Sequence, residues 1–365
     1  MPPSRAAFVL FTAAIGGSLT AAADLEKISV KGKFFVDASG RTRFFHGFCD
    51  AGEETNRVGR FDGTNYLPTN LLQDPRNLDR LVNEFGFNAF RIGAMWAALQ
   101  PTENETDHVY LEALQNATKT LGDVGAYALL DMHQDGLSTR VHSYSGMPEW
   151  LAERSDIRHP YPWPFKKVAH SDVTAAAGQL FQELYDNTHG GRDAWAKAWR
   201  TFAAAFKGFP SVLGYELLNE PFAGDPWANP LLWDPAYAGS HNLAPSYEAV
   251  SRAIREEDDA TVIFFEPVTW GMIWSNRLLG SGFTTVPGGA AYANRSAFSF
   301  HYYCRLFSPQ NRSEPYPVPK KWECDRIGGP KVFLTLTLNL TLTALVDPRC
   351  SARSTKRSPR LAGRA

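Results

Sequence analysis

The sequence of 365 residues predicts an α/β fold, a (β/α)8 TIM barrel of parallel strands covered by helices. Short apolar segments alternate with helical patterns, which is typical of parallel β/α units. Polar side chains stand at the ends of successive predicted strands, where a barrel carries its active site. The competing fold, an open doubly wound sheet, has less support because no glycine-rich phosphate turn follows the first strand.

The elements follow from local patterns taken in chain order. A small hairpin over 28–37 is expected to cap or plug one end of the barrel. Asp74 and Pro75 are typical of a helix start, and Gly86 of its end. A stretch rich in Trp, Tyr and Pro at 144–165 is an insertion. Seven barrel strands are predicted at 43–49, 88–93, 127–131, 212–218, 261–266, 297–303 and 331–335, and helices at 75–85, 109–121, 194–206 and 247–257.

The strand at 212–218 is the one around which we organise the functional prediction. Its apolar residues indicate burial on both faces, and it stops at Asn219 and Glu220, followed by Pro221, which cannot continue a central strand. A carboxylate and an amide at the end of a buried strand cost stability unless they are paired or used. A plain polar strand terminus beside a turn is the alternative interpretation of this segment.

Polar residues at the other strand ends strengthen the functional interpretation. They are Arg91, His133, Asn219, Glu220, Glu266 and His301. Singly, the arginine is as well explained by a structural ion pair, and the histidines by hydrogen-bonded strand ends. Together on one rim they favour a site in which Glu220 is the general acid/base of a retaining glycosidase, a reaction that needs two carboxyl groups about 5 Å apart.

The composition is that of a globular protein and restricts the partners. Hydrophobic residues make up 44% of the chain, and 37 Lys and Arg nearly balance 38 Asp and Glu, so nothing indicates binding to nucleic acid. The aromatic fraction of 13% suits sugar stacking but also suits an ordinary large core. We expect a monomer.

The N-terminus predicts a secretory signal peptide at 1–23. Arg5 precedes an apolar run at 6–15, and alanines at 21–23 resemble a cleavage site. A disordered or anchoring N-terminus is the alternative. Secretion, or the lumen of the secretory or lysosomal pathway, fits with five N-glycosylation sequons at Asn104, Asn116, Asn294, Asn311 and Asn339. The four cysteines (Cys49, Cys304, Cys324 and Cys350) fit an oxidising compartment, and we predict a Cys304–Cys324 disulfide across a loop rich in Pro and Asn.

Five segments carry a resemblance to a known family, and they lie at 90–93, 131–135, 214–221, 265–269 and 301–304. With these segments the chain resembles glycoside hydrolase family 5, and within it the endoglycoceramidases. The resemblance spans 43–335 and implies a TIM barrel that hydrolyses the bond between glycan and ceramide without a metal or organic cofactor. It implies that Glu220 is the acid/base. The supporting residues it implies are Asn219, His133, Asp135, Arg91, His301 and Tyr303.

The chain departs from the family where the nucleophile is expected. The family has a glutamate at the end of the seventh strand, whereas this chain has Leu336 after Thr335. Glu266, which ends the fifth predicted strand, is better interpreted as a structural or substrate-contact residue than as a substitute nucleophile. The prediction is therefore a catalytic barrel at 24–335 with strands one to about seven, and impaired or absent turnover.

The segment 336–365 is predicted to be an aberrant, disordered tail. Leucines from 334 to 342 alternate with Thr or Asn, and no eighth strand, final helix or C-terminal β-domain follows. We hypothesise that this segment is not descended from the family's sequence but reflects a retained intron, a frameshift or a faulty gene model. Sequencing the transcript across the Thr335 codon tests the hypothesis.

Two other functions remain open on the sequence. One is a catalytically dead sugar-binding or glycolipid-binding protein, and the other is a cellulase-like β-glucanase or a sterol glucosidase. A glycosphingolipid substrate requires an apolar wall beside the leaving group, which 147–151 and 163–165 could supply, with contact to membrane lipid at the periphery. Aromatic loops also bind β-glycans, so the substrate class stays open here.

Overall fold

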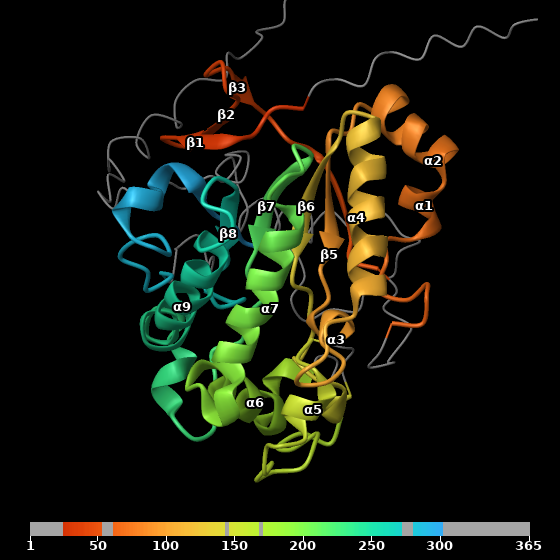
Figure 1. The fold of residues 1–365 in the computed structure, drawn as a ribbon. Coiled ribbons are helices and arrows are strands. Elements are labelled where there is room, and N and C mark those ends of the chain that lie inside the picture. The colour runs from red at the N-terminus through yellow and green to blue at the C-terminus, as the bar shows by residue number, and fades with distance from the viewer. Residues whose placement is uncertain (1–24, 53–60, 143–145, 168–170, 272–279, 302–365) are drawn as a thin grey trace, which may run out of the picture.

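Six parallel strands form the centre of the molecule (Figure 1). The computed structural model describes residues 25–52, 61–142, 146–167, 171–271 and 280–301. The strands are β4 (Gly47–Asp50), β5 (Ala89–Gly93), β6 (Tyr127–Asp131), β7 (Val212–Glu216), β8 (Val262–Phe265) and β9 (Ser296–Phe298). They pair in chain order, each parallel to the next. Parallel strands in sequential order, joined by helical crossovers, are the arrangement of a β/α barrel.

The predicted strands are largely confirmed within this part of the chain. The predictions at 88–93, 127–131, 212–218, 261–266 and 297–303 correspond to β5 to β9 with shifted ends. The prediction at 43–49 was wrong in detail, because that segment is divided between a short strand β3 (Thr42–Arg43) and β4. The predicted signal peptide, the seventh strand at 331–335, the disulfide and the tail at 336–365 lie outside the described residues.

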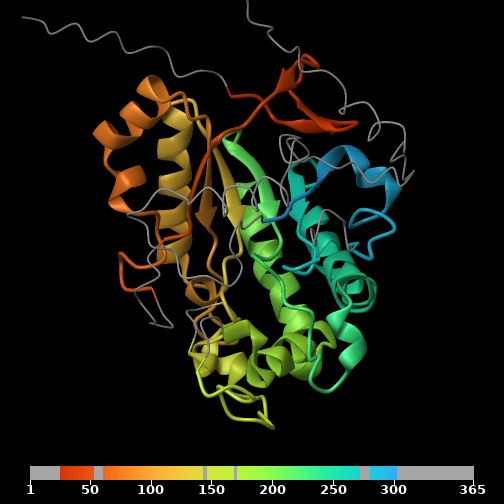
Figure 2. The ribbon, with the colours of Figure 1, turned by 180° about the vertical axis from the view of Figure 1, so that it is seen from behind.

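Three long helices cover the outer face of the strands, as Figures 1 and 2 show from opposite sides. They are α4 (His108–Asp123), α7 (Gly191–Phe206) and α9 (Ala244–Arg255), each amphipathic with its apolar stripe buried. The predicted start of the first helix is confirmed, since the Asp74 carboxylate accepts a hydrogen bond from Arg76 N (2.9 Å) and caps α2 (Pro75–Asp79). That helix continues as a π-helical turn, η1 (Arg80–Glu84).

Shorter elements occupy the connections between the strands and long helices. The α-helices are α1 (Asn70–Gln73), α3 (Trp96–Leu99), α5 (Glu149–Ala152), α6 (Ala175–Tyr185) and α8 (Pro235–Ala238). The remaining turns are η2 (Thr139–Val141), η3 (Ser171–Val173), η4 (Thr188–Gly190), η5 (Pro230–Trp233), η6 (Gly239–Leu243) and η7 (Ala290–Arg295). The sequence analysis did not predict α6, in which nine of the eleven residues are buried and only Gln182 and Glu183 mark a polar side.

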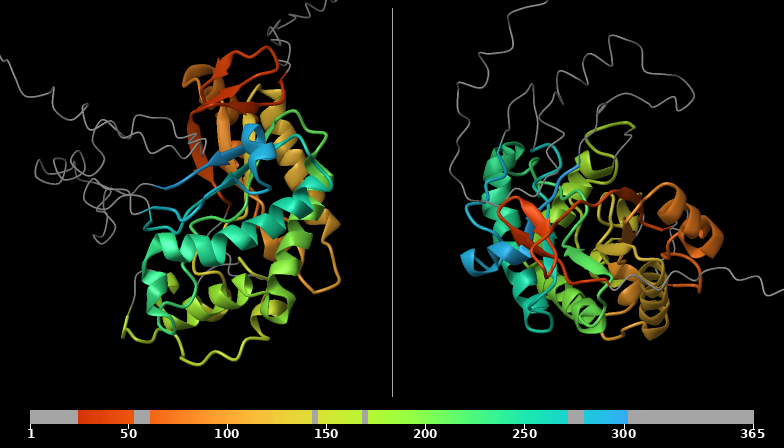
Figure 3. Two further views of the ribbon diagram at one scale, coloured as in Figure 1. Left: turned by 90° about the vertical axis from the view of Figure 1, so that its left-hand side faces the viewer. Right: turned by 90° about the horizontal axis from the view of Figure 1, so that it is seen from above.

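The predicted hairpin is confirmed and closes the N-terminal end of the strands (Figure 3). It comprises β1 (Ser29–Lys31) and β2 (Phe34–Val36), which pair antiparallel, and β3 adds a third strand. Ile28, Val30 and Phe35 form one apolar cluster with residues at the starts of the barrel strands, among them Tyr127 and Leu213. Because apolar side chains cover this end of the barrel, a polar site would lie at the opposite end, where the strands have their carboxyl ends.

Much of the aromatic content is core. Trp96, Trp195 and Trp199 are fully buried. These residues belong to an ordinary large core, which was one of the two explanations for the aromatic fraction, although other tryptophans lie at the surface. None of the helices in the described ranges combines the length and the apolar character needed to cross a bilayer.

Candidate active site

Arg91 stands at the centre of the polar rim. It lies on β5, and its guanidinium reaches three carboxylates of neighbouring strands. Nε lies 2.5 Å from Glu216 Oε2, Nη1 lies 2.9 Å from Asp131 Oδ2, and Nη2 lies 3.6 Å from Glu266 Oε1. Nη2 also donates to Asn219 Oδ1 at 2.8 Å. One buried cation thus connects the ends of β5, β6, β7 and β8.

The charges in this cluster stabilise one another. Burial lowers the pKa of Arg91, but the carboxylates of Asp131 and Glu216 outweigh it and raise that pKa well above its ordinary value. Burial raises the pKa of Asp131, but the positive charge of Arg91 and the contact with His133 lower it below its ordinary value overall. Arg91 therefore stays charged and holds Asp131 ionised inside the barrel.

The segment after β6 is tied to the segment after β7. His133 Nδ1 lies 2.6 Å from Asp131 Oδ2, and its Nε2 lies 3.9 Å from Asp135, whose side chain is 36% exposed. Gln134 Nε2 donates to Asn219 O at 2.6 Å, and Asn219 Nδ2 donates to Gln134 O at 2.8 Å. These reciprocal amide bonds fix the backbone on which Glu220 is carried.

Glu220 has a strained backbone and a strongly bonded side chain. Its φ of 43° lies in the left-handed region, which residues other than glycine rarely adopt. Such strain persists only where surrounding structure imposes it, and it gathers at functional sites. Its Oε1 lies 2.6 Å from His301 Nδ1, and its side chain is 14% exposed. The carboxylate is therefore held in place yet open to a substrate.

His301 lies between two carboxyl groups. Its Nδ1 meets Glu220, and its Nε2 lies 3.5 Å from Oε1 of the buried Glu266. Burial lowers the pKa of His301, but Glu266 and Glu220 outweigh it and raise that pKa to about 9. Burial, with Glu216 adding to it, raises the pKa of Glu266 to about 8 against the opposing effect of His301. This part of the rim therefore retains protons at neutral pH.

The structure brings most of the predicted site residues together. Arg91, His133, Asn219, Glu220 and His301 converge at the carboxyl ends of the strands, and Asp135 stands at the margin. Tyr303, and Leu336 at the expected nucleophile position, lie outside the described residues. The roles assigned to all these residues remain predictions.

Four acidic or hydroxyl residues of the rim were missed. Asp131 and Glu216 were interpreted as parts of motifs, although a lone carboxylate in a strand buried on both faces signals a buried partner. Ser299, whose hydroxyl donates to Glu216 Oε1 (2.8 Å), gave no signal in the sequence. Neither did Asp172, on the turn η3, whose pKa burial and the charges of Asp135 and Glu220 raise to about 7.

The described residues contain no group of three or more His, Cys, Asp or Glu side chains arranged to hold a metal ion. The positive charge at the rim comes instead from Arg91 and His301. Cys49, on β4, has a free thiol that accepts a hydrogen bond from Arg91 Nη1 at 3.2 Å.

Comparison with known families decides the affiliation of this barrel. The family model for cellulase (glycosyl hydrolase family 5) matches residues 53–329, which is most of the chain. The chain belongs to glycosyl hydrolase family 5. The resemblance inferred from the sequence motifs is therefore confirmed. The strand-end cluster, which consists of Arg91, Asp131, His133, Glu216, Asn219, Glu220, Glu266 and His301, lies at the carboxyl ends of the strands, where a β/α barrel has its active face.

Similar curated proteins are named endoglycoceramidases. The chain is 37% identical over 301 residues to an endoglycoceramidase of Hydra vulgaris, covering 77% of this chain and 56% of that protein. It is 30% identical to endoglycoceramidase I of Rhodococcus hoagii, covering 78% of this chain and 54% of the relative. The chain thus spans about half the length of these curated relatives.

Solved structures show the same fold. Endo-glycoceramidase II from Rhodococcus sp. in complex with ganglioside GM3 superposes with a TM-score of 0.61 at 22% identity, over 81% of this chain and 63% of that chain. The six described strands are accordingly part of a (β/α)8 TIM barrel, as predicted.

A chain of aromatic side chains leads away from Glu220. This aromatic ridge consists of Trp270, Trp233, Trp227, Trp163 and Phe165. The first three follow one another, and Trp163 and Phe165 both pack on Trp227, with ring centroids 5.5–6.0 Å apart in each pair. Trp270 packs on Phe222, and the neighbouring Thr269 N donates to Pro221 O at 3.2 Å. The ridge therefore begins at the segment that carries Glu220.

The ridge only partly matches the apolar wall predicted from the sequence. Trp163 and Phe165 are 41% and 40% exposed and belong to it. Met147 and Leu151 are buried and pack into the main core instead, so the prediction was wrong for these two residues.

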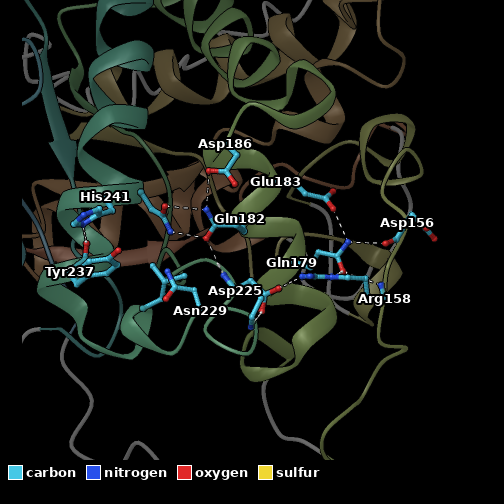
Figure 4. A pocket seen from close by; sticks show the side chains of 13 residues that line it. Asp156, Arg158, Gln179, Gln182, Glu183, Asp186, Asp225, Asn229, Tyr237 and His241 are labelled. Atoms are coloured by element: carbon cyan, nitrogen blue, oxygen red, sulfur yellow. Dashed lines mark hydrogen bonds and ion pairs between the residues drawn. The ribbon is translucent and has the colours of Figure 1, made fainter.

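A cavity of about 800 Å³ lies elsewhere, beside α6 and α8 (Figure 4). It shares no residue with the strand-end cluster. Its polar side chains are largely satisfied by one another: Arg158 pairs with Asp225, Gln179 Nε2 donates to Glu183 (2.7 Å), and Gln182 bonds to Asn242. Because the polar side chains that line this cavity already pair with one another, few of them are available to bind a ligand. We therefore assign the catalytic role to the strand-end cluster.

Proposed function

We propose that this chain carries the site of a retaining glycoside hydrolase of the endoglycoceramidase type, which cleaves the bond between glycan and ceramide in glycosphingolipids. The observation that carries the proposal is the Glu220 carboxyl group, held 2.6 Å from His301 at the strand-end rim of a family 5 barrel. The relatives named endoglycoceramidase support this substrate class over a plain β-glucan.

In this mechanism Glu220 acts on the glycosidic oxygen. It donates a proton to the leaving ceramide oxygen, and after a glycosyl-enzyme intermediate forms it takes a proton from the attacking water. Arg91 holds the side chain of Asn219, the residue before Glu220, and the proposed role of His133 and the partly exposed Asp135 is to donate to or accept from sugar hydroxyls. Tyr303 keeps its proposed supporting role.

The covalent step needs a second carboxylate, and Leu336 stands where the family resemblance places it. We therefore propose that this chain binds glycosphingolipid but turns it over several orders of magnitude more slowly than a family member with the glutamate.

The aromatic ridge supports a lipidic leaving group. Trp233 is 43% exposed, and ring edges of tryptophan favour the interface between water and lipid. We propose that the ridge contacts the ceramide or the surface of the membrane that holds it. Trp233→Ser should reduce retention of the chain on vesicles containing lactosylceramide. Phe85→Ser, which removes an even more exposed aromatic residue (59%) outside the ridge, should not.

Secretion and glycosylation are part of the same proposal. The signal-peptide pattern at 1–23 supports export, and Asn104, Asn116 and Asn294 are exposed. Expression in eukaryotic cells should place the chain in the medium with a mass that falls after treatment with a peptide N-glycosidase. A chain retained in the cytosol without glycans would contradict this proposal.

The function is tested by measuring binding and turnover of lactosylceramide with a fluorescent acyl chain. We expect saturable binding, little ceramide release by this chain, and more release by Leu336→Glu. Binding without release by either protein would favour the catalytically dead glycolipid-binding alternative. Release of sugars from cellulose oligomers or a sterol glucoside, without lactosylceramide binding, would favour the other enzymes, and no binding at all would overturn the proposal.

A further inference from the structure

Glu266 is a buried carboxyl group that the proposed mechanism does not use. It follows β8 and is 1% exposed, and its Oε1 has no hydrogen-bond partner. Its backbone oxygen accepts a hydrogen bond from Tyr247 Oη at 3.0 Å, which fixes the end of the strand. An unsatisfied carboxyl oxygen in a buried position costs free energy, so its retention needs an explanation.

The surroundings of Glu266 indicate what it acts on. His301 Nε2 lies 3.5 Å from its Oε1, and Arg91 Nη2 lies 3.6 Å away. The other nitrogen of the same ring, Nδ1, lies 2.6 Å from Glu220 Oε1. The imidazole therefore bridges a buried carboxyl group and the candidate acid/base.

We propose that Glu266 is a positioning residue for Glu220: its carboxyl group holds the His301 ring from the Nε2 side, so that Nδ1 stays directed at Glu220 Oε1 and keeps a proton in that contact. This inference rests on the proposed function of Glu220 and deepens it. A carboxyl group behind a histidine fixes the orientation of the ring and stabilises its protonated form.

The charges around the ring are consistent with this role. His301 faces Glu220 from the segment after β7, Glu266 from β8, and Arg91 and Asp131 from β5 and β6. Among these, Glu266 has the largest effect in raising the pKa of His301. Glu216 opposes ionisation of Glu266, and Tyr247 also interacts with it electrostatically. Loss of Glu266 should therefore leave His301 more easily deprotonated and Glu220 less firmly held.

Glu266 is poorly suited to the alternative role of nucleophile. It is almost inaccessible, and His301 lies between it and Glu220. A nucleophile must contact the anomeric carbon directly and stand across the sugar from the acid/base.

The test is a titration of His301 by imidazole ¹⁵N NMR in the full chain, with its signal among the 9 histidines assigned through His301→Gln. Glu266→Gln keeps the shape but cannot ionise, whereas Glu266 is ionised in the alkaline range where His301 titrates, so we expect the midpoint of His301 to fall by roughly one pH unit or more. Glu257→Gln, which removes a surface carboxylate paired with Lys207, should leave the midpoint unchanged.

An unchanged midpoint in Glu266→Gln would overturn the proposal. If that variant does not fold, Glu266→Asp retains a carboxyl group but moves it away from the His301 ring, because its side chain is one methylene shorter. A His301 midpoint equal to that of the wild type would then also overturn the proposal. The titration does not depend on turnover or on glycolipid binding. The His301 midpoint can therefore stay unchanged in a chain that binds glycolipid, or fall in a chain that does not. Failure of this proposal is thus distinguishable from failure of the proposed function.

Discussion

At the scale of single residues, the rim depends on Arg91. Three carboxylates from three strands lie around its guanidinium, and its side chain is only 12% exposed. Buried charges are tolerated when paired, but removing one partner leaves the others uncompensated. Arg91 therefore stabilises the barrel and at the same time sets the charge state of the site.

We predict that Arg91→Gln lowers the free energy of unfolding by about 3–5 kcal/mol, because Asp131 and Glu216 lose their counter-charge inside the barrel. Urea denaturation followed by circular dichroism measures the change. Arg76→Gln is the matched control, since Arg76 pairs with Asp74 but its side chain is 90% exposed. Equal stability of the two variants would show that the cluster is not held by Arg91.

The sequence allowed the rim residues to be predicted where they stand at strand ends. Asn219 and Glu220 were recognisable because a polar pair interrupts an apolar strand before a proline. Glu216, three residues earlier, was not, because its role depends on a contact with Arg91, 125 positions away in sequence. Local patterns give the position of a side chain on a strand, whereas its partners depend on the pairing of strands.

At the scale of elements, the β1–β2 hairpin closes one end of the barrel. Phe35 is 7% exposed and packs between Phe45 and Phe264, with centroid distances of 5.4 and 5.7 Å. Its neighbour Phe34 points to the other face and is 43% exposed. Alternation along a strand thus separates a core residue from a surface residue of the same type.

We predict that Phe35→Ala lowers the free energy of unfolding by about 3 kcal/mol, because it opens a cavity beneath the hairpin. Phe34→Ala should change it far less. Urea unfolding of both variants tests the difference, and comparable losses would mean that the hairpin does not cover the strand starts.

Elements with a clear period were predicted, and those without one were not. The helices α4, α7 and α9 show an apolar stripe, so their existence followed from the sequence. The helix α6 is marked more weakly, because nine of its eleven residues are buried and its polar side is reduced to Gln182 and Glu183. The barrel order followed because sequential parallel strands leave few topologies.

At the scale of the whole molecule, the two ends of the described strands differ in chemistry. The N-terminal end is closed by apolar side chains such as Ile28 and Val30, whereas the carboxyl end gathers Arg91, Glu220 and His301. This polarity places an apolar cover at one end of the barrel and its titratable groups at the other. Folding stability should therefore respond to pH through the rim.

We predict that the free energy of unfolding falls as the pH rises from 6 to 9. His301 has an ordinary pKa of 6.5 and about 9 in the folded chain, and Glu266 has 4.5 and about 8. Between these values the folded chain binds more protons than the unfolded chain, so raising the pH favours unfolding. The lowered pKa of Asp131 acts at the acid side, where its contribution is lost as the pH falls through the acidic range.

Urea denaturation at several pH values in constant ionic strength measures this dependence. Glu266→Gln removes one of the two groups and should flatten the slope between pH 6 and 9. A slope of opposite sign, or one that the substitution does not alter, would mean that the rim does not retain these protons.

The central claim is that Glu220, at the rim of a family 5 barrel, faces the glycan of a glycosphingolipid. Calorimetric titration of the full chain with a short-acyl, water-soluble lactosylceramide tests it most directly, with Glu220→Gln as the variant. The account predicts saturable binding at one site, weakened at least about tenfold by the substitution, which corresponds to roughly 1.4 kcal/mol. Absence of binding, or binding that Glu220→Gln leaves unchanged, would contradict it.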